Sequence, residues 1–159
     1  MSFGFRTFVS ALFLSAGAAA ACPDWSFNGD QYAFTGQQLY QPQRLAVLAG
    51  GDQRLAKCRI PFGSDQGDGF VTVAPDFTVQ ISGLSRYQLV VSVYSECDSV
   101  LLLNTGNENW FYDDDDNADS QLDARILLTR PRDGIYDFWV GTHDGSTCNA
   151  VFELETYDR

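Results

Sequence analysis

Apolar and polar residues alternate over several short stretches of the chain. In 77–82 (FTVQIS) and in 150–155 (AVFELE), every second side chain is apolar, so one face of each segment is suited to a core. Four further segments are rich in β-branched and aromatic residues: 88–94, 99–104, 124–128 and 135–140. Turn-forming residues separate these segments, at Ser82-Gly83, Thr105-Gly106-Asn107, Arg132-Asp133-Gly134 and His143-Asp144-Gly145. The pattern predicts a series of short β-strands.

Helical periodicity is absent from the sequence. The nearest approach is 43–57, and Gly50-Gly51 interrupts it. About 7–10 short strands separated by such turns favour an all-β fold, a jelly-roll-like β-sandwich. The looser segment 22–68 is too short to build a core of its own. We therefore expect a single domain over 22–159, in which an amino-terminal extension (22–68) adds strands to a core formed by 69–159.

Residues 1–21 have the layout of a secretory signal peptide. Arg6 is their one charged residue, and an apolar stretch from Phe8 ends in small residues at Ala21. Because this stretch is shorter than the roughly 20 residues of a membrane span, we expect a soluble, periplasmic or secreted protein without membrane insertion. Cleavage here would make Cys22 the first residue, so an acylated lipoprotein is an alternative, although the Leu usual three positions earlier is missing.

Four cysteines, Cys22, Cys58, Cys97 and Cys148, follow the predicted signal. An even number in an exported chain predicts two disulfides, for which three pairings are possible. No C-x-x-C pair occurs, which argues against a zinc knuckle or a redox motif. We favour Cys22–Cys58, which would staple the amino-terminal segment to itself, and Cys97–Cys148, which would join the end of one strand to the start of the last.

The chain is strongly acidic, with a formal net charge of −11 that becomes −12 once Arg6 is removed with the signal. Such a charge disfavours binding to nucleic acid or to an anionic membrane surface. It would instead attract cations or basic partners.

From about Gly69 onward, the chain resembles the bacterial pre-peptidase C-terminal domain family. Four motifs carry the resemblance and occur in the family's order: 98–103 (DSVLLL), the acidic 113–117 (DDDDN), 122–126 (LDARI) and 134–141 (GIYDFWVG). The resemblance implies a jelly-roll-like β-sandwich without catalytic activity, here as a stand-alone version. Some members bind calcium in acidic loops and others bind extracellular polymers. An extracellular polymer or an exported protein is therefore the expected partner of this chain, which we expect to be a monomer.

The acidic run is the most conspicuous candidate site. Calcium takes six to eight oxygen ligands, and the run with its neighbours offers Asp98, Asp113, Asp114, Asp115, Asp116, Asn117, Asp119 and Asp123. An EF-hand loop starting at Asp113 is excluded, because Ala118 stands where Gly is required and Ala124 where Glu is required. The sequence leaves two alternatives, a calcium site of another geometry and a solvated acidic turn without an ion.

Two further candidates are aromatic and catalytic. Trp110 and Tyr112 share one face if 109–112 is extended, where they could bind a carbohydrate or a peptide; the alternative is that they belong to the core. His143, Asp144 and Ser146 are the residue types of a serine-peptidase triad, but residues adjacent in a turn cannot place the His between nucleophile and carboxylate. No carboxylate pair is singled out for glycosidase chemistry. We therefore expect a binding or stabilising module rather than an enzyme, and a small secreted serine peptidase is the remote alternative.

Overall fold

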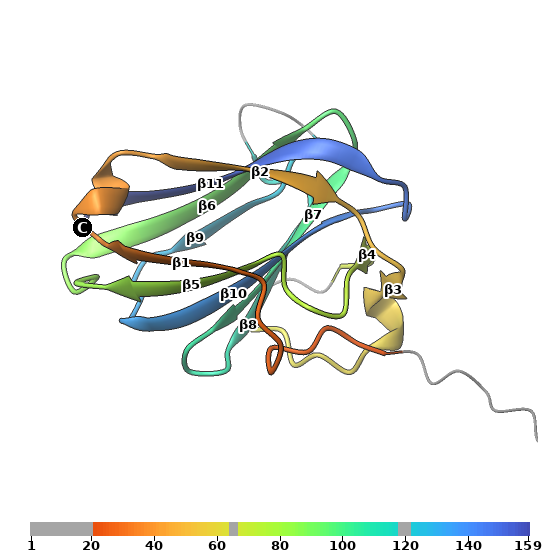
Figure 1. Cartoon of the computed structure of the whole chain (residues 1–159), viewed down its shortest axis with the longest axis horizontal. Helices are drawn as coiled ribbons and strands as arrows, with labels where there is room; N and C mark the ends of the chain where they lie inside the picture. Colours follow the sequence, from red (N-terminus) through yellow and green to blue (C-terminus); the bar gives the residue numbers. More distant parts are fainter. Residues whose placement is uncertain (1–20, 64–66, 118–121) are drawn as a thin grey trace, which may run out of the picture.

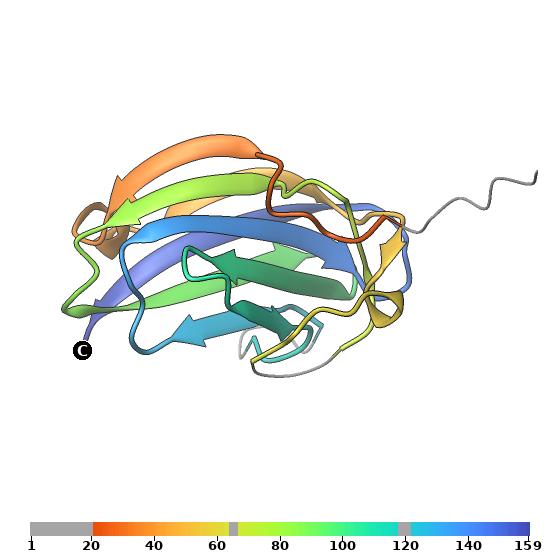
Figure 2. The same ribbon diagram turned by 90° about the horizontal axis from the view of Figure 1, so that it is seen from below.

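The computed structural model describes residues 21–63, 67–117 and 122–159. This part of the chain contains eleven strands in two sheets and two short 3-10 helices, η1 (Gln38–Tyr40) and η2 (Leu55–Lys57). The all-β sandwich expected from the sequence is confirmed. Figure 1 shows the two sheets stacked with their strands running along the long axis, and Figure 2 shows the layers from below.

The larger sheet has seven strands: β1 (Asp30–Thr35), β3 (Gln53–Arg54), β4 (Phe70–Val71), β5 (Phe77–Ser82), β7 (Ser99–Thr105), β8 (Trp110–Asp113) and β10 (Gly134–Thr142). Its centre is β10, which pairs with β5 and β4 and also with β7, and β8 follows β7 as the outermost strand on that side. At the opposite edge β1 pairs with β5 in parallel.

The smaller sheet has four antiparallel strands in the order β2-β11-β6-β9: β2 (Gln43–Ala49), β11 (Cys148–Asp158), β6 (Tyr87–Ser95) and β9 (Arg125–Leu128). Both sheets therefore contain strands from the amino-terminal segment, as its β1 and β2 flank the sandwich on one side. On the other side β8 and β9 are edge strands of their respective sheets.

The main core lies between the sheets and follows the alternation of the sequence. In β5 the inward side chains Phe77, Val79 and Ile81 are buried, and in β11 Phe152 and Leu154 are fully buried. The rings of Phe77 and Phe152 stack across the sandwich with centroids 4.8 Å apart. Because one face of each strand meets this core, period-two patterns located these strands correctly.

A second, smaller core lies on the outer face of the larger sheet. It consists of Leu55, Val71, Val100, Leu102, Trp110, Tyr112 and Trp139, with Ile60 and Phe62 packed against it. The amino-terminal segment around η2 covers this face, and in Figure 2 it crosses the sheet near β8. Hence β7 is buried on both faces, which is why its sequence is a continuous apolar run.

The disulfides have the pairing that we favoured. Cys22–Cys58 joins the start of the described chain to the segment over the second core, and Cys97–Cys148 joins the end of β6 to the start of β11. Since Cys22 is disulfide-bonded, it has no free thiol to acylate as a lipoprotein would require. Two disulfides are typical of exported proteins. No helix in the described ranges is long and apolar enough to cross a membrane, and residues 1–20 of the predicted signal lie outside those ranges.

Candidate functional site

The acidic run begins with a buried carboxylate at the end of β8. Asp113 is only 8% exposed, and its Oδ2 accepts the backbone N–H of Arg125 at 2.7 Å and that of Asp116 at 3.2 Å. Arg125 begins β9, so this carboxylate connects the edge strands of the two sheets. Burial raises the pKa of Asp113 to about 6, against the opposing effect of the two N–H donors.

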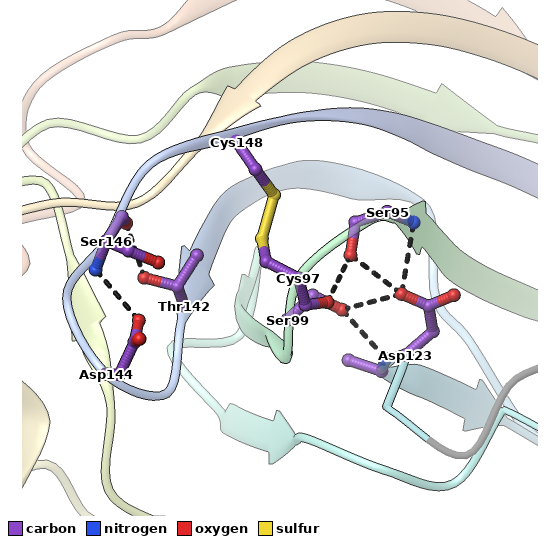
Figure 3. The surroundings of a disulfide bond; sticks show 9 residues. Ser95, Cys97, Ser99, Asp123, Thr142, Asp144, Ser146 and Cys148 are labelled. Carbon is purple, nitrogen blue, oxygen red and sulfur yellow. Dashed lines mark hydrogen bonds between the residues drawn. A yellow bond between two sulfur atoms is a disulfide. The ribbon is translucent and has the colours of Figure 1, made fainter.

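Asp123 is buried in a second network beside the Cys97–Cys148 disulfide. Its Oδ1 accepts the backbone N–H of Ser95 at 3.0 Å and lies 2.8 Å from the Ser95 hydroxyl and 3.3 Å from that of Ser99. Figure 3 shows these groups converging on one carboxylate oxygen. Asp123 therefore fixes the turn between β6 and β7, and both deeply buried acids of the region serve the fold.

The intervening polar residues also contact the protein itself. Asn117 is buried and donates from its side-chain amide to the backbone carbonyl of Val93 at 3.0 Å. Asp114 is half-buried, with its Oδ2 3.2 Å from the Tyr112 hydroxyl. Burial, and then the charge of Asp115, raises the pKa of Asp114.

The remaining predicted ligands are not brought together. Asp115 and Asp116 are exposed, and Asp98 lies 4.0 Å from His143 Nδ1. Asp119 lies outside the described residues. Within the described ranges, no group of three or more His, Cys, Asp or Glu side chains is placed to hold a metal ion. Calcium binding by the run stays a prediction that the arrangement of these side chains does not strengthen.

Trp110 and Tyr112 lie in the second core, 7% and 3% exposed. Trp110 packs on Trp139 with ring centroids 5.4 Å apart, and Phe62 meets the Tyr112 ring edge-on at 5.8 Å. Neither ring has an open face on which a sugar could stack. The structure assigns both to the core, the alternative stated above, and not to a ligand-binding surface.

The residues with triad chemistry form a turn between β10 and β11. Asp144 Oδ1 accepts the backbone N–H of Ser146 at 2.9 Å, and the Ser146 carbonyl accepts the Thr142 hydroxyl at 2.7 Å (Figure 3). The hydrogen bonds from Ser146 lower the pKa of Asp144. The carboxylate thus contacts the serine instead of orienting the histidine, the reverse of what a triad needs.

A cleft of about 570 Å³ lies at the other end of β8, between the β7–β8 turn and the β9–β10 loop. Both segments lie at the same end of the sandwich as the carboxyl terminus, in both views of Figures 1 and 2. The pairing of Tyr136 with Thr105 in β10 and β7 brings the two segments together. The cleft is lined by Thr105, Gly106, Asn107, Asn109, Phe111, Leu127, Leu128, Thr129, Arg130, Pro131, Arg132, Asp133 and Tyr136.

Both walls of the cleft are fixed by hydrogen bonds. In the β7–β8 turn, the Thr105 N–H donates to the Asn109 carbonyl at 3.0 Å, and the Glu108 N–H donates to the Thr105 carbonyl at 2.7 Å. In the β9–β10 loop, the Tyr136 hydroxyl donates to the Arg132 carbonyl at 2.5 Å and accepts its N–H at 3.1 Å. The cleft is therefore preformed.

Glu108, at the tip of the β7–β8 turn, has a φ of 58° and is the single non-glycine residue with positive φ in the described chain. That left-handed conformation costs an ordinary side chain on the order of 1 kcal/mol. Strained residues of this kind cluster at binding sites, where the surrounding structure maintains them. Glu108 is not part of the cleft lining, although its neighbours Asn107 and Asn109 are.

Sequence reasoning located both segments as turns and missed the cleft between them. An available signal was Arg130-Pro131-Arg132, two arginines in a short loop of a chain that carries twice as many acids as bases (21 against 10). The distance along the chain between the two turns concealed their proximity, which only the register of β7 and β10 creates.

Comparisons with known proteins show distant likenesses only. No protein-family model matches the chain, and no curated protein matches it. A periplasmic lysozyme inhibitor of g-type lysozyme, PliG from Aeromonas hydrophila, is similar in structure with a TM-score of 0.47 and 8% identity, over 82% of this chain and 98% of that one. The pre-peptidase C-terminal domain of a collagenase from Bacillus anthracis gives a TM-score of 0.39 and 12% identity, over 80% and 96%. At this distance, the expected resemblance to that domain family extends to the general fold, and neither likeness establishes a family or a function.

Proposed function

We propose that the protein is an exported, non-catalytic binding module whose ligand occupies the end cleft. The observation that carries the proposal is the cleft itself. Its volume of about 570 Å³ lies within the range of roughly 300–1,000 Å³ that is usual for ligand sites. Because hydrogen bonds within the protein hold both walls, a ligand would not have to order them on binding, which favours affinity.

The chemistry of the lining supports binding rather than catalysis. Among the described residues that line the cleft, Asp133 is the one carboxylate, and its oxygens accept the backbone N–H groups of Gly83 and Leu84 at 2.9 and 2.8 Å. Glycosidases of the usual kind need a pair of carboxylates across the scissile bond. The lining has neither His nor Cys, so a nucleophile there would have no adjacent base of the usual kind.

Calcium binding by the acidic run is a separate proposal. Asp115 and Asp116 expose their charge to solvent, and β8 separates the run from the cleft, since it begins at Trp110 beside the cleft and ends at Asp113. An ion there would stabilise the fold by binding to the folded state alone. It would not contribute to recognition in the cleft.

Nuclear magnetic resonance tests the proposed site. Isotope-labelled mature protein is titrated with acidic oligosaccharides, neutral oligosaccharides and short peptides, and the amide signals are followed. We expect at least one class to shift the signals of 105–109 and 129–133 and to remain chemically intact over hours. If every class leaves those signals unmoved, or if a bound probe is converted to product, the proposal fails.

A blocking substitution supplies the matched control. Thr129 is an exposed residue of the cleft lining, so Thr129→Trp should fill the cleft and abolish the shifts. Asn28 is also exposed, does not line the cleft, and lies just before β1, at the edge of the larger sheet opposite β8. Asn28→Trp should therefore bind as the unmodified protein does.

A further inference from the structure

We infer that the ligand of the end cleft is an acidic saccharide, whose carboxylate is held by Arg130 and Arg132. The inference rests on the proposed function, because it names the ligand class of the same site. Three features of the lining carry it: its charge, the engagement of its one acid and the mixture of amide, hydroxyl and apolar groups.

The cleft lining carries two arginines against one carboxylate, whereas acids outnumber bases in the protein as a whole. Arg130 and Arg132 are exposed residues of the lining in a chain of net charge −11. In the described structure neither forms an ion pair, whereas Arg44 lies 2.5 Å from Glu153 on the smaller sheet. A guanidinium presents a planar set of donors that matches a carboxylate with two parallel hydrogen bonds. Two free guanidinium groups in one cleft therefore favour a carboxylate ligand.

The acid in the lining is already engaged. Both oxygens of Asp133 accept backbone N–H groups, from Gly83 and Leu84. These bonds lower the pKa of Asp133. Since the carboxylate is committed to the 83–84 turn, the two guanidinium groups remain available to an incoming anion.

The rest of the lining suits a saccharide. Asn107 and Asn109 offer amide donors and acceptors, and Thr129 offers a hydroxyl. The half-buried ring of Phe111 and the 45% exposed side chain of Leu127 add apolar surface. A uronic or muramic sugar carries a carboxylate, hydroxyl groups and an apolar ring face on one rigid body. In such sites a small number of precisely placed polar groups on an apolar wall fix the orientation of the ligand and provide specificity.

Calorimetric titration of the mature protein tests the inference. The probes are oligosaccharides of galacturonic acid, of glucuronic acid, and of alternating N-acetylglucosamine and N-acetylmuramic acid, each as the free acid and as the neutral methyl ester. We expect at least one free acid to bind, and its ester to bind at least tenfold more weakly. Loss of one charged hydrogen-bonded pair lowers affinity about tenfold. The double variant Arg130→Gln/Arg132→Gln should therefore bind the free acid at least tenfold more weakly than the unmodified protein does.

Arg59→Gln is the matched control, because Arg59 is an exposed arginine outside the cleft lining. It should change the affinity less than twofold. The inference is overturned if no free acid binds, if ester and acid bind equally, or if the Arg59 variant loses as much affinity as the double variant. If neutral sugars or peptides shift the cleft signals while the acids do not, the acidic-saccharide inference fails and the proposed binding site stands. If nothing shifts them, both fail.

Discussion

The buried carboxylate of Asp113 should make the protein less stable at neutral pH than in mild acid. Its pKa rises from 3.8 in the unfolded chain to about 6 in the fold, chiefly through burial. A carboxyl group with a raised pKa contributes its full stabilisation below pH 3.8 and loses it as the pH rises through 6. The contribution of Asp113 to the free energy of unfolding therefore falls by about 2.4 kcal/mol between pH 4 and pH 7.5.

Asp113→Asn isolates this effect. The amide keeps an acceptor oxygen for the backbone N–H groups of Arg125 and Asp116 but carries no charge to desolvate. We expect the free energy of unfolding of the variant minus that of the unmodified protein to rise by up to about 2.4 kcal/mol between pH 4 and pH 7.5. Urea unfolding at the two pH values measures the shift. Other titrating groups, such as the buried Asp76, are present in both proteins and cancel in the comparison.

Asp115→Asn is the control, because it removes a charge from the same run at an exposed position. It should change the unfolding free energy by no more than about 0.5 kcal/mol at either pH. If the difference in unfolding free energy between Asp113→Asn and the unmodified protein is the same at pH 4 and pH 7.5, or falls as the pH rises, the reasoning is refuted. That result would mean that hydrogen bonds to the charged carboxylate outweigh its burial.

Three other predictions concern the fold and the ion. Cys97→Ser/Cys148→Ser should lose about 4 kcal/mol of stability in the chain-entropy model for a separation of 51 residues, measured by urea unfolding, and an unchanged midpoint would contradict it. Trp139→Ala should cost about 3–5 kcal/mol in the same assay, because this fully buried ring packs on Trp110 in the second core, and a cost below about 1 kcal/mol would contradict that packing. If the acidic run binds calcium, thermal melts should show a higher midpoint with calcium than with chelator, and Asp114→Asn/Asp115→Asn should abolish the difference; equal midpoints in the unmodified protein would remove the calcium proposal.

Most strands could be read from the sequence: some, such as β5, by the alternation of apolar and polar residues, and others, such as β7, by the continuous apolar run of a strand that is buried on both faces. The prediction for 77–82 coincides with β5, and those for 88–94, 99–104, 135–140 and 150–155 fall within β6, β7, β10 and β11. The first residue of 124–128 lies just outside β9. In each of these segments, side-chain alternation or β-branched content reports directly on burial.

The second core was beyond the reach of local patterns. In the second core Leu55 packs with Trp110 and Trp139, although more than fifty residues of sequence separate it from either tryptophan. A covered outer face removes the polar half of the alternation, so the aromatic residues there looked the same as surface residues available to a ligand. Trp110 and Tyr112 were therefore ambiguous until the covering segment was placed.

The acidic run shows the same limit for charge. Four consecutive aspartates are equivalent in sequence, yet Asp113 is buried while Asp115 and Asp116 are exposed. The difference arises because Asp113 ends β8 with its side chain directed to the N–H of Arg125 on the other sheet. A composition-based argument detects the repulsion in such a run but not which carboxylate the fold uses.

A crystal structure of the mature protein with an acidic oligosaccharide would test the central proposal most directly. We predict the sugar in the cleft between the β7–β8 turn and the β9–β10 loop, with a carboxylate oxygen about 2.7–2.9 Å from a guanidinium nitrogen of Arg130 or Arg132. A sugar bound at any other surface, or bound in the cleft with its carboxylate directed away from both arginines, would contradict it.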